Sequence, residues 1–284
     1  MTKKERKDLE LIEDAIKKFP KIIADKKRAY QAKEKILKRF KTNSKKFKDI
    51  IDSESETQKT HPWRFCVPGR HWVRDHDLHI KPSQNHPDGK TIRHGHCADN
   101  PSHKDSLYAG EIHDIAEKYF SNLRGPPKLD SLGYDHGNDY DEFIRGWTKY
   151  WNDIFQPKDP LDPNLVKALI ATESGFDKNI KVRAGKGIGY ARGLMQVTDQ
   201  TQKILEDIRG ELKDHLVHVS QNEMTNPNMN IAAGIRWLFR KKEIADSRGK
   251  ALPWIDAISK YKKLPKDSDV MQRLKRLYDR LRKK

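Results

Sequence analysis

The sequence has few apolar residues and no long apolar run. Hydrophobic residues make up only 35% of its 284 residues, and charged residues make up another 35%. No segment approaches the roughly eighteen consecutive apolar residues of a membrane-spanning helix, so we expect no membrane span. The residues from Met1 to Asp8 are polar and no apolar stretch follows them, so we expect no Sec signal peptide.

The net charge of +17 is concentrated at the two ends of the chain. The first fifty residues contain 18 lysines and arginines against 8 aspartates and glutamates, and residues 262–284 contain 10 against 3. Such ends can bind an anionic surface, or they can simply be solvated helix faces. We favour an anionic polymer as the partner. Nucleic acid is not expected, because no nucleic-acid-binding motif accompanies the charge.

Residues 1–58 are expected to form a basic, amphipathic helical arm. Apolar side chains recur at spacings of three, four and seven residues, namely at Ile12, Ile16, Phe19, Ile23, Tyr30, Leu37 and Phe40. Pro20 interrupts this pattern, which favours a helical hairpin over one long helix. The hairpin could pack on the body of the protein or on a delivery or secretion partner.

Residues 59–125 are expected to form a small α+β domain. Nine of the twelve histidines and both cysteines fall between His61 and His113. Short strands are predicted at residues 70–74 and 90–93, and a helix at residues 107–123.

The two cysteines allow three interpretations. Cys66 and Cys97 could bind a structural zinc ion with His71 and His96, since two cysteines and two histidines suit tetrahedral zinc. They could instead form a disulfide, as expected in an oxidising periplasm. The third interpretation is two buried thiols beneath a histidine-rich surface. No cofactor is expected for catalysis.

Residues 139–284 are expected to form a second, helical domain, after a boundary at residues 124–138. Phe143, Trp147, Tyr150 and Trp151 recur at helical spacing, which favours core packing over sugar stacking. Helices are predicted at about residues 140–155, 162–174, 199–209, 227–242, 253–263 and 268–283, with at most a small sheet near residues 180–197.

Glu173 is the residue that most clearly points to chemistry. The helix before it begins with Asp162 as N-cap and Pro163 at the first helical position, and Gly175 ends it. Glu173 therefore lies in the last turn, where the negative end of the helix dipole and burial would both favour the protonated carboxyl. A protonated glutamic acid is what a general acid needs to be when it cleaves a glycosidic bond.

Four motifs in order resemble the soluble lytic transglycosylases. They are Glu173-Ser174-Gly175-Phe176, then Gly193-Leu194-Met195-Gln196, then Asn226-Pro227 to Gly234, and finally Trp254 to Tyr261. The resemblance covers about residues 140–265. It implies a lysozyme-like, mostly helical fold and a peptidoglycan lytic transglycosylase. This family cleaves the bond between N-acetylmuramic acid and N-acetylglucosamine and leaves a 1,6-anhydromuramoyl end.

The resemblance also implies the roles of individual residues. Glu173 would be the only acid and base, protonating the leaving oxygen and then deprotonating the sugar's 6-hydroxyl. The substrate-binding residues would be Ser174, Met195, Gln196, Asn230 and Tyr261. From the residues alone, Met195 and Tyr261 could equally be core residues, and Asn230 could hold a loop instead of a sugar.

Two positions depart from the family pattern. Val182 stands where the family usually has a serine that can bond the glutamate, within an insertion over residues 181–190. Lys262 follows Tyr261 where the family has asparagine, which could move the pKa of the catalytic carboxyl.

The sequence thus predicts a mainly α protein, in which a helical arm and a small His/Cys-rich region precede a lysozyme-like catalytic domain. One alternative is a goose-type muramidase, a hydrolase with Asp177 or Asp199 as second carboxylate. Another is a non-catalytic cell-wall-binding or assembly protein. In each case we expect action at the bacterial cell wall or periplasm, reached without Sec or through phage or lysis.

Overall fold

The computed structural model describes residues 63–84, 86–102, 104–246 and 252–283. The chain divides into two compact units, Met1–Ser53 and Glu54–Lys284, and every described residue belongs to the second. The predicted arm over residues 1–58 lies outside the described residues.

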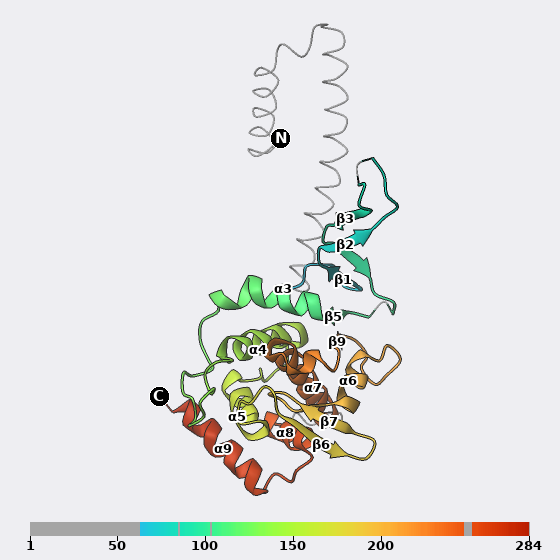
Figure 1. Ribbon diagram of the computed structural model, residues 1–284. Coiled ribbons are helices and arrows are strands. Elements are labelled where there is room, and N and C mark those ends of the chain that lie inside the picture. The colour runs from blue at the N-terminus through green and yellow to red at the C-terminus, as the bar shows by residue number, and fades with distance from the viewer. Residues whose placement is uncertain (1–62, 85, 103, 247–251, 284) are drawn as a thin grey trace, which may run out of the picture. The chain divides into compact units, whose positions relative to one another are not determined.

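The described residues are mainly helical, which confirms the predicted fold class (Figure 1). The α-helices are α3 (Ala109–Tyr119), α4 (Asp141–Phe155), α5 (Pro163–Glu173), α6 (Asp199–Glu206), α7 (Pro227–Asp246), α8 (Trp254–Lys262) and α9 (Asp269–Arg282). Short 3₁₀ turns are η2 (Phe120–Asn122) and η3 (Glu223–Thr225). None of the helices described is long and apolar enough to cross a bilayer.

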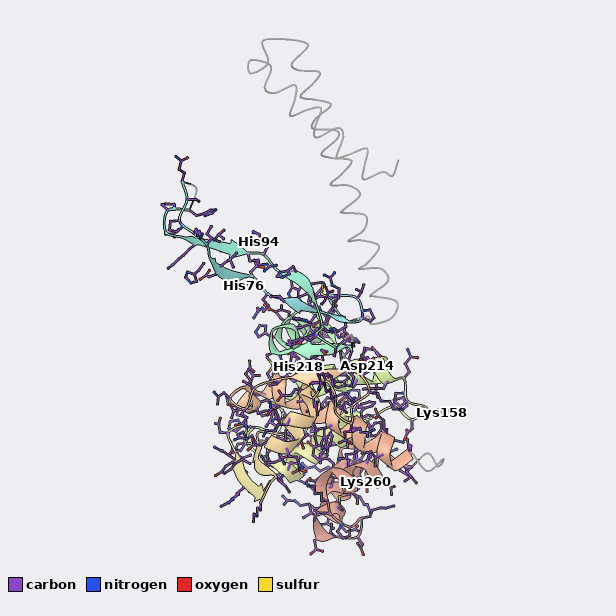
Figure 2. The ribbon with its side chains drawn as sticks, turned by 90° about the vertical axis from the view of Figure 1, so that its right-hand side faces the viewer. His76, His94, Lys158, Asp214, His218 and Lys260 are labelled. Carbon is purple, nitrogen blue, oxygen red and sulfur yellow. A yellow bond between two sulfur atoms is a disulfide. The ribbon has the colours of Figure 1, made fainter. Side chains whose placement is uncertain are left out.

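The strands are short and form small sheets. They are β1 (Arg70–Val73), β2 (His76–His79), β3 (Lys90–Arg93), β4 (His96–Asp99), β5 (Ser106–Tyr108), β6 (Lys181–Gly185), β7 (Gly189–Arg192), β8 (Val197–Thr198) and β9 (Leu216–His218). Strand β1 pairs with β4 and β2 with β3, both antiparallel, and β6, β7 and β8 form an antiparallel sheet. His76 lies on β2 opposite Arg93, and His94 follows β3, with both histidines exposed (Figure 2).

Helix α4 packs its aromatic residues into the core against α7. Trp147, Tyr150 and Trp151 are fully buried. The indole of Trp147 donates to the Asn228 side-chain oxygen over 2.6 Å, and that of Trp151 donates to the Ala232 carbonyl over 3.0 Å. The prediction that these aromatics belong to the core is confirmed.

Residues before the predicted boundary share this core. Leu107, Ile112 and Phe120 are buried in the same hydrophobic cluster as the α4 aromatics. Strand β5 pairs in parallel with β9, more than a hundred residues later in the chain. The segment at residues 124–138 is therefore a connection across one core, whereas the sequence suggested a division between two domains.

Helix α5 begins and ends as its sequence predicts. The Asp162 side chain accepts a hydrogen bond from the Asn164 backbone N–H over 2.8 Å, with Pro163 at the first position. The residues between Leu165 and Ala171 are buried. Because the helix is packed along its length, its last residue, Glu173, is held in a fixed place.

Candidate active site

The chain leaves α5 through a tightly bonded turn directly after Glu173. Gly175 and Phe176 have φ values of +59° and +67°, and Phe176 is fully buried beside the Tyr134 ring. The Ser174 hydroxyl donates to the Ile170 carbonyl over 3.3 Å and accepts from the Phe176 N–H over 3.2 Å. Ser174 was predicted to bind substrate, but in this structure its hydroxyl closes the helix end.

Glu173 forms an ion pair with Lys262 from the last turn of α8. The carboxylate Oε1 lies 2.8 Å from the ammonium Nζ, and the two side chains are only 14% and 5% exposed. Burial raises the pKa of Glu173 above its ordinary value, and the charge and hydrogen bond of Lys262 act in the opposite direction. The net effect leaves the pKa raised, as a general acid requires.

Tyr261 lies beside this pair, but its hydrogen bond goes elsewhere. Its hydroxyl donates to the Met195 carbonyl over 2.6 Å. Burial raises the pKa of the phenol well above its ordinary value, and the nearby Glu173 adds to the rise. The phenol is therefore a neutral donor that connects α8 to the Gly193–Gln196 turn.

Asn230 holds the Gly193–Gln196 turn and is fully buried. Its side-chain oxygen accepts from the Met195 N–H over 2.7 Å, and its amide donates to the carbonyls of Arg192 and Met224, each over 2.9 Å. Asn230 was predicted as a substrate-binding residue, but its side chain is bonded to backbone groups and holds the Gly193–Gln196 turn in place.

Two glycines let the turn approach α7 closely. Gly193 has a φ of +69°, and a Cβ there would lie 2.6 Å from the side-chain nitrogen of Asn230 on α7. Met195 is fully buried, and a Cβ on Gly234 would lie 2.5 Å from its sulfur. Met195 is thus a core residue in this structure. This is the second of the two interpretations that the sequence allowed, and the first was contact with substrate.

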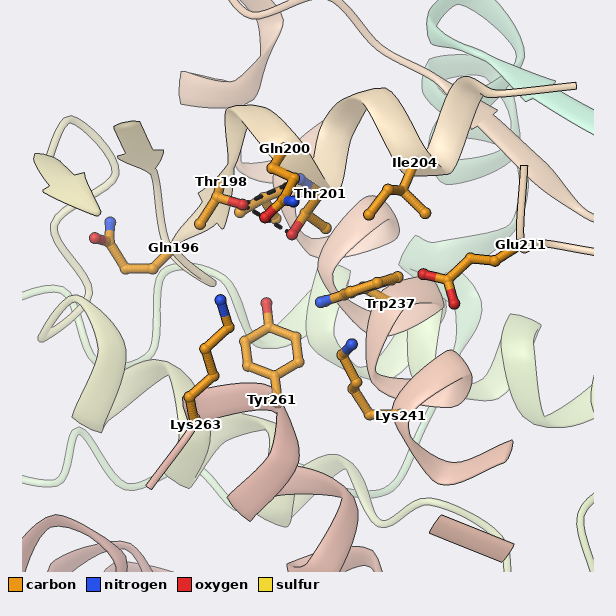
Figure 3. Close-up of a pocket in the computed structure, with 11 residues that line it drawn as sticks. Gln196, Thr198, Gln200, Thr201, Ile204, Glu211, Trp237, Lys241, Tyr261 and Lys263 are labelled. Carbon is orange, nitrogen blue, oxygen red and sulfur yellow. Dashed lines mark hydrogen bonds between the residues drawn. The ribbon is translucent and has the colours of Figure 1, made fainter. Parts of the chain in front are cut away.

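Two of the predicted substrate-binding residues, Gln196 and Tyr261, line a cavity. The Gln196 amide nitrogen donates to the Gly193 carbonyl over 2.9 Å. The pocket that Gln196 and Tyr261 help to line has a volume of about 230 Å³ (Figure 3). The pocket combines polar side chains with apolar and aromatic ones; its other lining residues are Val197, Thr198, Gln200, Thr201, Ile204, Glu211, Trp237, Lys241 and Lys263. Polar groups around an aromatic face suit a sugar ring.

Sequence reasoning missed the far wall of this pocket. Trp237 and Lys241 lie one turn apart on α7, with the ammonium 3.7 Å from the centre of the indole ring. They follow Gly234 at helical spacing, so they lie on the same face of α7 as Gly234, the last residue of the third motif. Glu173 is not among the residues that line the pocket, and the connection between them runs through Tyr261 and its neighbour Lys262.

The two proposed second carboxylates bond to groups other than Glu173. Asp199 forms an ion pair with Arg192 and accepts from the Tyr190 N–H over 2.8 Å. Asp177 is exposed and accepts from the Asn179 N–H over 2.9 Å. Val182, where the family has a serine, is 48% exposed on β6. Lys262 takes the place of a hydroxyl as the hydrogen-bond partner of Glu173.

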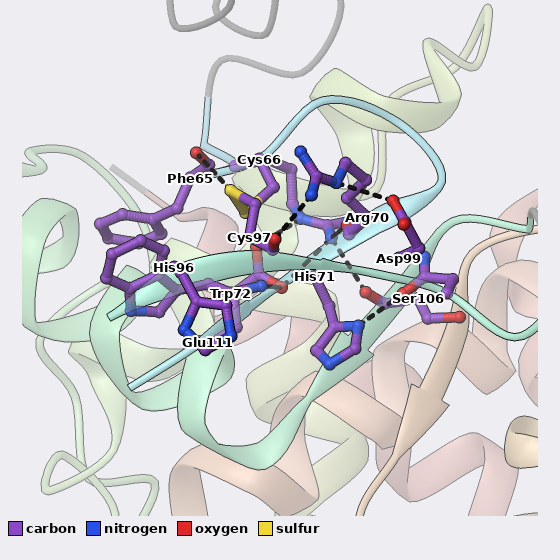
Figure 4. Close-up of a disulfide and its surroundings, with 12 residues drawn as sticks. Phe65, Cys66, Arg70, His71, Trp72, His96, Cys97, Asp99, Ser106 and Glu111 are labelled. Carbon is purple, nitrogen blue, oxygen red and sulfur yellow. Dashed lines mark hydrogen bonds and ion pairs between the residues drawn. A yellow bond between two sulfur atoms is a disulfide. The ribbon is translucent and has the colours of Figure 1, made fainter. Parts of the chain in front are cut away.

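A disulfide joins Cys66 and Cys97, and it replaces the predicted zinc site (Figure 4). Zinc binds cysteine as a thiolate, which a disulfide sulfur cannot offer. His71 bonds instead to the Asn100 side chain over 2.8 Å, and His96 to the His94 carbonyl over 3.1 Å. The alternative of a disulfide is the one that the structure supports.

Reduction of this disulfide is expected to destabilise the protein. A bond that closes a loop of 31 residues typically contributes about 3 kcal/mol, because it restricts the unfolded chain. We expect a thermal melt with a reductant to show a lower Tm for the wild-type protein. The Cys66→Ser/Cys97→Ser double variant should melt at that lower temperature with or without the reductant. An unchanged wild-type Tm would contradict a stabilising disulfide.

Comparison with known families agrees with the motifs. Residues 152–261 match the model of the transglycosylase SLT domain. The resemblance that the sequence predicts is confirmed over this segment. Members of this family are lysozyme-like lyases that cleave glycosidic bonds of peptidoglycan. The match includes Glu173 and ends at Tyr261, one residue before Lys262. No curated protein matches the chain.

Proposed function

We propose that this protein is a peptidoglycan lytic transglycosylase in which Glu173 is the only acid and base. The observation that carries the proposal is the position of Glu173: a largely buried carboxyl at the end of α5, with a raised pKa, inside the segment that matches the SLT domain. A carboxyl of this kind can hold a proton and release it to a leaving group.

The proposed reaction needs only one carboxyl. Protonated Glu173 donates to the glycosidic oxygen, and the bond between that oxygen and the anomeric carbon of N-acetylmuramic acid breaks. The Glu173 carboxylate then takes the proton of the 6-hydroxyl of the same sugar, whose oxygen bonds to the anomeric carbon. The proton given to the leaving sugar is thereby recovered, and no water is added. The contacts of Asp177 and Asp199 agree with such a mechanism.

Purified peptidoglycan provides the test of this proposal. The full-length protein should release muropeptides one water lighter than those released by a hydrolase, and Glu173→Gln should release them about a thousandfold more slowly. Hydrated products would favour the muramidase alternative. If both proteins sediment with the wall and neither releases a product, the non-catalytic wall-binding alternative would replace the proposal.

Gln196 is proposed to bind a sugar in the adjoining pocket. Gln196→Asn keeps an amide and tolerates the φ of +49°, but withdraws the amide by one methylene. We expect the KM for soluble glycan fragments to rise about tenfold, as for one lost hydrogen bond, with little change in kcat. Gln272→Asn, on α9, is the matched control. An unchanged KM would remove Gln196 from the substrate site.

We also propose that the protein acts at the bacterial cell wall, where its substrate is found. The disulfide supports an oxidising compartment. The helical arm and its anionic-polymer or delivery partner stay predictions, because residues 1–58 lie outside those that the structure describes.

A further inference from the structure

Lys262 brings a positive charge to the carboxyl on which the proposed reaction depends. It is the last residue of α8 and reaches the end of α5, ninety residues earlier in the chain. Its ammonium contacts the Glu173 carboxylate over 2.8 Å and the Thr172 carbonyl over 3.3 Å. The Thr172 carbonyl belongs to the last turn of α5, where the helix dipole favours a cation. Two contacts therefore hold the ammonium in place.

Such a buried pair has a direct consequence for a general acid. Removing two charges from water costs free energy, and only their close contact offsets it. The contact stabilises the carboxylate form of Glu173, whereas the first step of the proposed reaction needs the protonated form. Lys262 is the less exposed of the two, with 5% of its side chain accessible, so its ammonium is shielded from solvent more than the carboxylate is.

The other charged groups packed around α5 have different partners. From α8, Tyr261 lies close to Glu173 and donates to the Met195 carbonyl. From α9, Arg273 donates to the Tyr134 hydroxyl over 2.6 Å, and Tyr278 donates to Asp162 over 2.8 Å. From α4, Asp141 forms an ion pair with Lys167 over 2.8 Å, two turns before Glu173. Lys262 is thus the cation that contacts Glu173 among the residues described.

We propose that Lys262 is a positioning residue for Glu173, whose ammonium orients the carboxyl and lowers the pH up to which Glu173 can protonate the glycosidic oxygen. The inference rests on the proposed function for its link to cleavage. The proton balance of the reaction involves Glu173 alone, which gives one proton to the leaving oxygen and recovers one from the 6-hydroxyl. As pH rises, activity falls when Glu173 loses its proton, and this fall comes at a lower pH than burial alone would produce.

Titration of Glu173 in the full-length protein tests the proposal without any need for activity. Protein labelled with carbon-13 at the glutamate carboxyls is titrated by NMR, and the Glu173 signal is identified by its absence in Glu173→Gln. In Lys262→Met, which keeps the length of the side chain and removes the charge, the midpoint should rise by about one to two pH units. Lys262→Arg, which keeps the charge, should titrate close to the wild type.

The pH dependence of kcat/KM on peptidoglycan is the second measurement. The alkaline limb should move to higher pH in Lys262→Met and stay near its original place in Lys262→Arg. A merely structural role would lower the whole profile without moving the limb. If Lys262→Met does not fold, Lys262→Asn, which restores the residue of the similar family, carries the same expectation.

The two measurements separate the possible failures. Equal Glu173 midpoints in the wild type and the neutral variants would overturn the proposal. A raised midpoint with an unmoved limb would overturn its link to cleavage. If the midpoint rises and no form of the protein cleaves peptidoglycan, the proposed function fails and the effect of Lys262 on Glu173 stands.

Discussion

Glu173→Gln is expected to lower the rate of peptidoglycan cleavage by about a thousandfold, the usual contribution of general acid and base catalysis. Glutamine has nearly the same shape, but it has no proton to give to the glycosidic oxygen and cannot accept one from the 6-hydroxyl. The measurement is the initial rate of muropeptide release at fixed protein concentration, together with a thermal melt to show that the variant is folded.

Asp177→Asn is the matched control for this variant. Asp177 lies four residues after Glu173 and is exposed, so its neutralisation should leave the rate within about twofold of the wild type. A folded Glu173→Gln protein that retained more than a tenth of the wild-type rate would remove Glu173 from the chemistry. A large loss in Asp177→Asn would revive the muramidase alternative.

Asn230→Ala should give the largest loss of stability among the site variants. The change leaves the Met195 N–H and the carbonyls of Arg192 and Met224 without their buried partner. Since each unsatisfied buried group costs about 1 kcal/mol or more, we expect unfolding to require about 3 kcal/mol less. In a domain of this size, such a loss corresponds to roughly 8 °C in Tm.

Asn179→Ala is the control for stability, because Asn179 is exposed and should change the free energy of unfolding by at most about 0.5 kcal/mol. Chemical denaturation of the three proteins gives the comparison. If Asn230→Ala loses stability as expected but keeps its KM at temperatures where it is folded, Asn230 supports the turn alone. A rise in KM without a loss of stability would instead favour the predicted sugar contact.

The local signals in the sequence located α5 and the catalytic candidate correctly. Asp162, Pro163 and Gly175 each act at a helix end through their own backbone chemistry, so their effect needs no knowledge of the tertiary fold. The roles of Met195 and Asn230 could not be read in this way. Whether a side chain faces a cleft or the core depends on which element packs against it. Here the Gly193–Gln196 turn packs against α7, which buries both Met195 and Asn230.

Contacts between distant residues account for the remaining differences. The pairing of β5 with β9 joins the segment before residue 124 to the helical core. No local sequence pattern predicts a parallel partner strand so far along the chain. The Glu173–Lys262 ion pair is likewise a contact between residues far apart in the sequence. The sequence marked Lys262 as unusual, but only the packing of α8 against the end of α5 shows what it contacts.

The most direct test of the central claim is cleavage of purified peptidoglycan in water enriched in oxygen-18. If Glu173 accepts the proton of the 6-hydroxyl and that oxygen bonds to the anomeric carbon of the same sugar, the new muramoyl ends contain no oxygen-18. They are also one water lighter than hydrolytic ends. Oxygen-18 in every new muramoyl end would show that solvent water attacks the anomeric carbon. That result would contradict the single-carboxyl transglycosylase account.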